Sequence, residues 1–173
     1  MTAVADCLDN GQGGTVTLKF THALTAITIK AGDDMLAGTI TGISISGVYG
    51  TGTYKIGSDT WNTTGSPTTF SIEDMNVPLP EDKDENDKNI DTKPGSDIIS
   101  GENTFMMIPQ TLGEGAKLEV QFTDNLTQTV RTLTANLKGS TWQKGKKVTY
   151  SISSTGIKIE PAVKLKIDHH NIW

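Results

Sequence analysis

Thr15-Val-Thr-Leu-Lys-Phe-Thr-His-Ala-Leu-Thr-Ala-Ile-Thr-Ile-Lys30 is the stretch of this sequence with the strongest fold signal. From Val16 to Phe20, apolar residues at even positions alternate with polar ones, which is the period of a strand with one face in a core and one in water. From Ile27 onward the apolar positions are odd-numbered. We therefore predict a bulge or corner at His22-Ala23-Leu24 that passes the chain to a second strand or a second sheet.

The remaining sequence also has the composition of short strands joined by turns. The chain has 173 residues, 35% of them hydrophobic, and is rich in Thr, Ser, Gly and Ile. Further strand patterns occur at 39–46, 52–57, 68–72, 103–110, 116–122, 127–134, 147–153 and 163–167. We expect a bulge at Gly42 and a hairpin from the segments on either side of Asp124-Asn125. The sequence predicts one all-β sandwich domain of roughly eight to ten short strands, with little or no helix.

Charge and cysteine content exclude several classes of protein. The net charge is −5 and Arg131 is the only arginine, which disfavours a nucleic-acid surface. No apolar run approaches the ~20 residues needed to cross a bilayer as a helix. Cys7 is the only cysteine, so an internal disulfide and a Cys-based zinc site are excluded.

An acidic, proline-flanked insert occupies about 76–101. Such a charge run lacks the apolar residues that would offset the entropy of ordering, so we predict a mobile loop. The spacing from Asp82 to Asn86 matches the first calcium ligands of an EF-hand loop. Asp87 and Lys93 replace the required Gly and Glu, which favours a solvated loop over a metal site.

No catalytic or cofactor-binding constellation is recognisable. The chain lacks a nucleophile elbow, a phosphate-cradling glycine loop and a zinc motif. Adjacent His169 and His170 would point to opposite faces of a strand, and His22 suits a structural role at the expected corner. Met106 and Met107 are interpreted as core filler. We therefore predict no enzyme, no cofactor and no metal site.

Four segments, taken together, resemble the fimbrillin-like or Mfa-like family, the two-domain pilin and pilus-accessory proteins of Gram-negative anaerobes. They are Val16 to Ile29, Phe105-Met-Met-Ile-Pro-Gln110, Trp142-Gln-Lys-Gly-Lys-Lys-Val-Thr-Tyr-Ser-Ile152 and the closing Ile172-Trp173. The first and third are the more specific. The resemblance is at the level of pattern and spans about residues 14–173.

The resemblance implies a transthyretin-like Greek-key sandwich in a protein that is exported as a lipoprotein and displayed on the outer membrane. It also implies assembly by strand exchange, in which a strand of one subunit fills a groove in the next. The lipobox and the N-terminal domain of the family are absent from this sequence. We therefore interpret residues 1–13 as a linker from a missing N-terminal domain and residues 14–173 as the C-terminal sandwich domain of a longer protein.

The first functional hypothesis is a structural or accessory subunit of a cell-surface fimbria that contributes to adhesion. Its expected partners are other pilin subunits, together with host or bacterial surface ligands. The candidate strand-exchange residues are Val163, Leu165 and Ile167, which alternate with lysines. An ordinary edge strand of the chain's own sandwich would show the same pattern.

The alternative is a surface module that binds a glycan or a host ligand. Its candidate platform is Trp61 with Tyr49 and Tyr54, because aromatic rings flanked by polar groups suit sugars and peptides. We expect residues 58–65 to form a loop. In that loop Trp61 would cap the end of the core, which is the competing interpretation of the platform.

Overall fold

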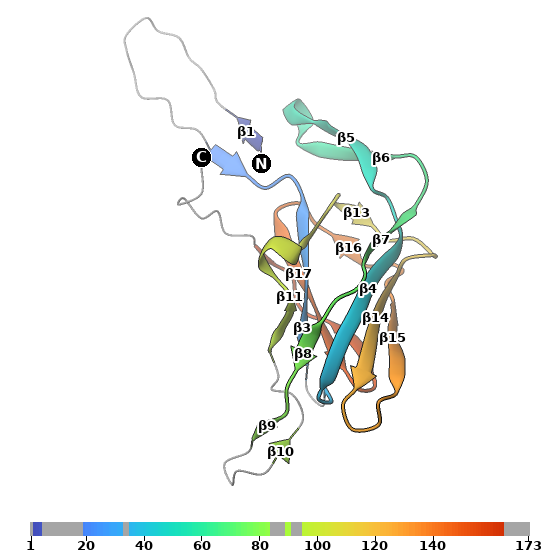
Figure 1. The fold of residues 1–173 in the computed structure, drawn as a ribbon. Coiled ribbons are helices and arrows are strands. Elements are labelled where there is room, and N and C mark those ends of the chain that lie inside the picture. The colour runs from blue at the N-terminus through green and yellow to red at the C-terminus, as the bar shows by residue number, and fades with distance from the viewer. Residues whose placement is uncertain (1, 5–18, 33–34, 84–88, 91–94, 165–173) are drawn as a thin grey trace, which may run out of the picture.

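The structure, a computed structural model, is built almost entirely of strands (Figure 1). It describes residues 2–4, 19–32, 35–83, 89–90 and 95–164. In these ranges the only helical elements are two single turns of 3-10 helix, η1 (Ile56–Ser58) and η2 (Gly101–Asn103). The all-β prediction is therefore confirmed. The described strands number nineteen, more than expected, because many are only two or three residues long.

Six strands form the first of two larger sheets. They are β3 (Thr25–Ala31), β11 (Asp97–Ile99), β12 (Phe105–Met107), β17 (Lys146–Ser153), β18 (Gly156–Ile159) and β19 (Val163–Lys164). At its centre β3 and β17 run parallel, with Ala26 opposite Lys147 and Ile29 opposite Tyr150. The other strand pairs of this sheet are antiparallel. The sheet thus joins the two segments that carry the most specific sequence pattern.

The second larger sheet has five strands. They are β4 (Gly38–Val48), β7 (Thr68–Ile72), β8 (Val77–Leu79), β14 (Lys117–Asp124) and β15 (Val130–Asn136). β14 and β15 form the expected hairpin. Between β14 and β4 the register shifts, since Gln121 opposes Gly42 while the next residue, Phe122, opposes Ile40. The extra residue on β4 is the bulge predicted at Gly42.

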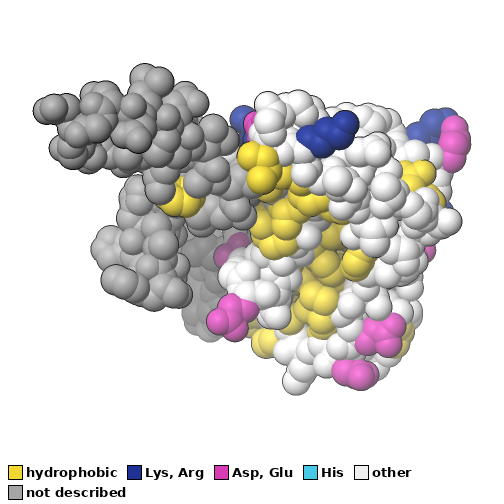
Figure 2. Space-filling model, turned by 90° about the horizontal axis from the view of Figure 1, so that it is seen from above, with side chains coloured by type: hydrophobic (Ala, Val, Ile, Leu, Met, Phe, Trp, Pro, Cys, Tyr) yellow, Lys and Arg dark blue, Asp and Glu magenta, His cyan; other side chains and the backbone are white. Residues whose placement is uncertain are grey.

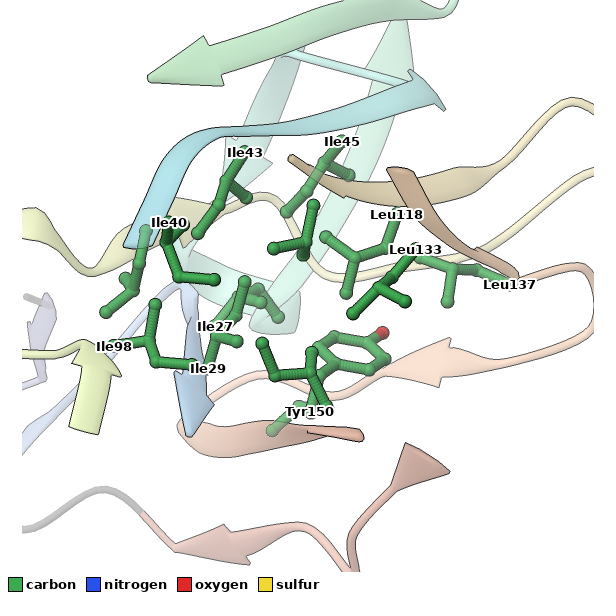
Figure 3. Close-up of a cluster of buried hydrophobic side chains, with 14 of the residues drawn as sticks. Ile27, Ile29, Ile40, Ile43, Ile45, Ile98, Leu118, Leu133, Leu137 and Tyr150 are labelled. Carbon is green, nitrogen blue, oxygen red and sulfur yellow. The ribbon is translucent and has the colours of Figure 1, made fainter. Parts of the chain in front are cut away.

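The core lies between these two sheets (Figure 3). Alternating side chains of β14 and β17 point inward, as their sequence period predicts. The buried set includes Ile27, Ile29, Ile40, Ile43, Ile45, Leu118, Val120, Phe122, Val148, Tyr150 and Ile152. β15 and β18 also lie against each other, so the two sheets meet along one side.

Four two-stranded sheets complete the fold. They pair β1 (Thr2–Val4) with β2 (Lys19–Thr21), β5 (Thr51–Lys55) with β6 (Thr60–Thr64), β9 (Asp82–Lys83) with β10 (Asn89–Ile90), and β13 (Gln110–Thr111) with β16 (Thr141–Trp142). β5 and β6 form a separate hairpin at the end of the sandwich that is uppermost in Figure 1. Residues 1–13, expected to be a linker, include strand β1 in their described part.

The predicted corner at His22-Ala23-Leu24 is present. β2 ends at Thr21 in one small sheet and β3 begins at Thr25 in the six-stranded sheet. The first four residues of the opening stretch, 15–18, lie outside the described residues. Phe20 was expected in the core but is 37% exposed. The reason is that β2 belongs to the small sheet with β1, away from the space between the two larger sheets.

The acidic insert is not irregular throughout. β8 pairs with β4 at its start and β11 pairs with β3 near its end, while β9 and β10 form a short hairpin between them. Pairing at both ends ties the insert to both larger sheets. The central charged residues, 84–88 and 91–94, lie outside the described residues.

Two further expectations from the sequence are wrong. Residues 58–65 were expected to form a loop, but Thr60–Thr64 is strand β6. The two methionines do not both fill the core, since Met107 is 4% exposed and Met106 is 47% exposed. Neighbouring residues of a strand point to opposite faces, and only one face of β12 meets the core.

Candidate functional site

The candidate strand-exchange segment begins on an edge of the six-stranded sheet. β19 consists of Val163 and Lys164, which pair with Lys147 and Lys146 of β17. Val163 is 52% exposed. Leu165 and Ile167 lie outside the described residues. The described part of this segment is therefore attached to the sandwich by a two-residue ladder, and its apolar side chain, Val163, is half exposed.

Two of the three candidate platform residues come together. Tyr54 and Trp61 are opposite each other on β5 and β6, and their ring centroids lie 5.3 Å apart at an interplanar angle of 45°. Both side chains are half-buried. Tyr49 lies at the end of β4 and is not part of this ring contact. In the structure, two of the three rings predicted for the platform therefore form a tilted aromatic pair.

A charged pair accompanies the two rings. Asp59 accepts hydrogen bonds from the Lys144 ammonium and from the Tyr54 hydroxyl. The same ammonium lies 5.9 Å from the centroid of the Tyr54 ring. The hydrogen bond from Lys144 lowers the pKa of Asp59, with the Tyr54 hydroxyl adding to it, and the same bond raises the pKa of Lys144. Both groups are therefore held in their charged forms at neutral pH.

The polar atoms of this cluster bind the protein itself. The indole N–H of Trp61 donates to the backbone oxygen of Ala23 across 2.7 Å, which links β6 to the corner. Lys144 belongs to the turn between β16 and β17. The cluster of Tyr54, Asp59, Trp61 and Lys144 thus connects the β5–β6 hairpin to two other segments, a use that the sequence did not reveal.

The Trp-x-x-Gly-Lys motif has a structural explanation. Trp142 and Tyr150 are both buried, and the indole N–H of Trp142 donates to the Tyr150 hydroxyl across 3.1 Å. Gly145 has φ +68°, a conformation that favours glycine, and its N–H donates to the Leu24 oxygen across 3.0 Å. The Thr25 hydroxyl donates to the Gln143 oxygen across 2.8 Å. The motif therefore holds the turn against the corner.

The Pro-Gln segment is explained in the same way. The side-chain oxygen of Gln110 accepts the Tyr49 N–H across 2.9 Å. Its side-chain N–H donates to the backbone oxygens of Tyr49, at 2.9 Å, and Ile108, at 3.0 Å. One amide thus ties the end of β4 to the start of β13, joining the five-stranded sheet to the β13–β16 pair.

Sequence reasoning missed an open hollow on the outer face of the five-stranded sheet. Its volume is about 700 Å³, and its polar lining includes Ser44, Ser71, Glu73, Glu119, Gln121 and Thr132. Gly42 forms part of its floor, where the bulge of β4 lies. Polar outward-facing positions of the strands produce this surface, and no single sequence motif marks it.

The surface view adds an apolar feature at one end. Figure 2 looks down on the end that is uppermost in Figure 1 and shows a band of apolar side chains among polar ones.

The described residues contain no group of three or more His, Cys, Asp or Glu arranged to hold a metal ion. Nor do they contain a helix long and apolar enough to cross a membrane.

The structure is thus an all-β domain with two larger sheets around one core. The side chains described above form hydrogen bonds that connect its strands and turns, as expected of a structural domain. The family model described as Fimbrillin-like matches residues 3–168, and the chain belongs to that family. Membership confirms the resemblance predicted from the sequence, and it agrees with the prediction that the chain is not an enzyme.

The sequence identity to individual relatives is low. The chain is similar to the fimbrium subunit Fim1C of Phocaeicola vulgatus, with 28% identity over 91% of this chain and 51% of that protein. A crystal structure of a fimbrial protein from Bacteroides vulgatus has a TM-score of 0.55 at 17% identity, over 93% of this chain and 60% of that one. A second, of a putative cell adhesion protein from Bacteroides ovatus, has a TM-score of 0.49 at 13% identity, over 90% and 49%. The chain therefore spans about half the length of the curated relative it matches.

Proposed function

We propose that this chain is part of a structural or accessory subunit of a cell-surface fimbria, and that the subunits join by β-strand exchange. Membership of the Fimbrillin-like family and the similarity to a fimbrium subunit support the fimbrial role. The proposal includes a transthyretin-like order of strands, export as a lipoprotein and attachment to the outer membrane. It also includes a contribution to adhesion through surface ligands of a host or of other bacteria.

The observation that carries the strand-exchange step is the attachment of β19. Val163 and Lys164 form a two-residue ladder with an edge of β17, and the Val163 side chain is half exposed. A strand fills a partner's groove through backbone hydrogen bonds and alternate side chains. Val163, Leu165 and Ile167 alternate with lysines in the sequence, so an extended strand of these residues would provide such a row. In the described residues only a two-residue ladder has to break when this segment moves to a neighbouring subunit.

Deletion of residues 161–173 tests the proposal. This deletion removes β19 and the candidate row but leaves β18 in place. The expected result is a folded chain, by circular dichroism and thermal unfolding, that no longer polymerises in electron micrographs or light scattering. Polymers that persist would contradict the donor role. A deleted chain that fails to fold would assign the segment to the chain's own sandwich, which also contradicts that role.

A substitution on one face sharpens the test. Replacing Val163, Leu165 and Ile167 together with Asp should abolish polymers, because carboxylates cannot enter an apolar groove without a large desolvation cost. The matched control replaces Lys164 and Lys166 with Ala on the opposite face and should polymerise normally. Equal effects of the two sets would argue against a face-specific groove.

A surface module for a glycan or host ligand is the second proposal, and the ring pair is the observation in its favour. Tyr54 and Trp61 are half-buried and lie beside Asp59 and Lys144. Glycan-array binding that is lost in Trp61→Ala with the fold retained would support it. Binding that survives in this variant, or an array with no bound glycan, would exclude the ring pair as a glycan site.

A further inference from the structure

The β5–β6 hairpin is attached to the sandwich in an unusual way. Its two strands pair only with each other, and within the described residues no backbone ladder joins them to either larger sheet. The hairpin re-enters the sandwich through Gly65, whose φ of +78° is the left-handed conformation that glycine adopts readily. Every residue of both strands is exposed or half-buried. Its position relative to the sandwich therefore depends on side chains.

The side chains that attach the hairpin, Trp61 and Asp59, bind the corner and the turn next to it. Trp61 donates its indole N–H to the oxygen of Ala23, in the middle of the corner between β2 and β3. Asp59 pairs with Lys144, in the turn before β17. That turn is itself bound to the corner through the Gly145 N–H and the Leu24 oxygen. The hairpin, the corner and the turn thus form one connected cluster.

The corner directly follows the small sheet of β1 and β2 in the chain. β2 enters the corner directly, and β1 pairs with β2 in a sheet of its own. In the described part of the chain, no ladder joins this pair to the six-stranded sheet. The corner is therefore the covalent link between β2 and the six-stranded sheet.

We propose that the β5–β6 hairpin is a hinged clasp, and that its docking through Trp61 and Asp59 governs how readily β1 and β2 separate from the sandwich. Opening the clasp breaks the hydrogen bond of Trp61 to Ala23, the ion pair of Asp59 with Lys144 and the contact of Lys144 with the Tyr54 ring, and leaves the core packed. Segments that lie outside the core open locally, at a much lower cost than global unfolding. By linkage, a molecule that binds the Trp61–Tyr54 pair more tightly when the clasp is open would also loosen the corner. This inference does not depend on how fimbrial subunits join.

Hydrogen–deuterium exchange of the whole chain tests the clasp. Trp61→Phe keeps an aromatic ring but removes the N–H that binds Ala23. The net worth of one such hydrogen bond corresponds to about a five-fold change in an opening equilibrium. We therefore expect exchange about five-fold faster in the peptides that cover 51–64 and 19–25, with β4, β14 and β17 unchanged. The control is Asn62→Ala, an exposed neighbour on the opposite face of β6, which should leave all segments unchanged.

A second variant probes the charged contact. In Lys144→Gln the ion pair is lost, so the same two peptides should exchange faster at low salt. Added salt should speed exchange in the original chain and have little further effect in the variant, because screening acts on the pair. Faster exchange at 51–64 with no change at 19–25 would overturn the coupling between hairpin and corner. A uniform increase over all segments would overturn the clasp, since it would mean that these residues support the whole fold.

Discussion

Trp142 donates its indole N–H to the hydroxyl of Tyr150 across 3.1 Å, and the side chains are 1% and 0% exposed. Trp142 belongs to β16, which pairs with β13, and Tyr150 lies in the middle of β17. The bond therefore links the small β13–β16 sheet to the centre of the six-stranded sheet. Each of these two side chains, eight residues apart in the sequence, satisfies the other's polar atom inside an apolar core.

Trp142→Phe should destabilise the chain. The substitution leaves the Tyr150 hydroxyl buried without its donor, at a cost of about 1–3 kcal/mol, and adds a loss of packing. Tyr150→Phe should cost a similar amount through the orphaned indole N–H. Urea unfolding followed by circular dichroism measures both, and the double variant should cost clearly less than the sum of the two. Additive costs would mean that the bond contributes nothing.

Tyr150 also predicts a loss of stability at alkaline pH. Burial raises the pKa of its hydroxyl above the usual value near 10, and the hydrogen bond from Trp142 offsets part of that rise. Because the folded state holds this proton more tightly than the unfolded state, the contribution is complete below pH 10 and is lost as pH rises through the folded pKa. The free energy of unfolding should therefore fall more steeply above pH 10 in the original chain than in Tyr150→Phe. Parallel curves would contradict the buried-hydroxyl explanation.

The Gln110 side chain gives a prediction about the join between β4 and β13. Gln110→Ala removes three hydrogen bonds to backbone groups of Tyr49 and Ile108, and we expect a loss of about 1–3 kcal/mol. Gln110→Glu keeps an acceptor but sets a carboxylate against two carbonyl oxygens. Its stability should improve as the pH falls and the carboxylate gains a proton. Thr111→Ala, at the next, exposed position, is the control and should stay within about 0.5 kcal/mol of the original chain.

Gly47 and Gly139 form a matched pair for testing a close backbone approach. Both have positive φ, +69° and +80°. A Cβ at position 47 would lie 2.1 Å from the Gly115 oxygen, whereas one at 139 would have nothing within 4 Å. Gly139→Ala should therefore cost only the strain of the left-handed conformation, about 1–2 kcal/mol. Gly47→Ala should cost distinctly more in the same urea titration, and equal costs would contradict the contact with Gly115.

Sequence periodicity predicted the strands that have one buried face. The alternation in 117–124 and 146–153 follows directly from the burial of every second residue against the core. Strand β6 was missed because it stands outside the core and Trp61 is its only apolar residue, so it shows no apolar alternation. Phe20 was wrongly expected in the core, since the pattern shows that one face is apolar but not which sheet the strand joins.

Contacts between segments far apart in the chain could not be predicted from the sequence. The parallel ladder of β3 and β17 joins residues about 120 positions apart, as in the contact of Thr28 with Thr149. The roles of Gln110 and Trp61 depend on backbone oxygens of Tyr49 and Ala23, and a backbone oxygen has no signature in a sequence. The residue types pointed to the family, but only the structure shows which groups they bind.

Strand exchange between subunits is tested most directly by cross-linking fimbriae assembled from an equal mixture of light and isotopically heavy chains. In one chain, Lys164 of β19 lies opposite Lys146 of β17, so a short lysine cross-linker reports where the segment around Val163 is bound. Our account predicts that cross-links from Lys164 or Lys166 in the polymer join light to heavy chains, and that those of the monomer stay within one chain. Polymers in which these lysines are linked only within one chain would contradict it.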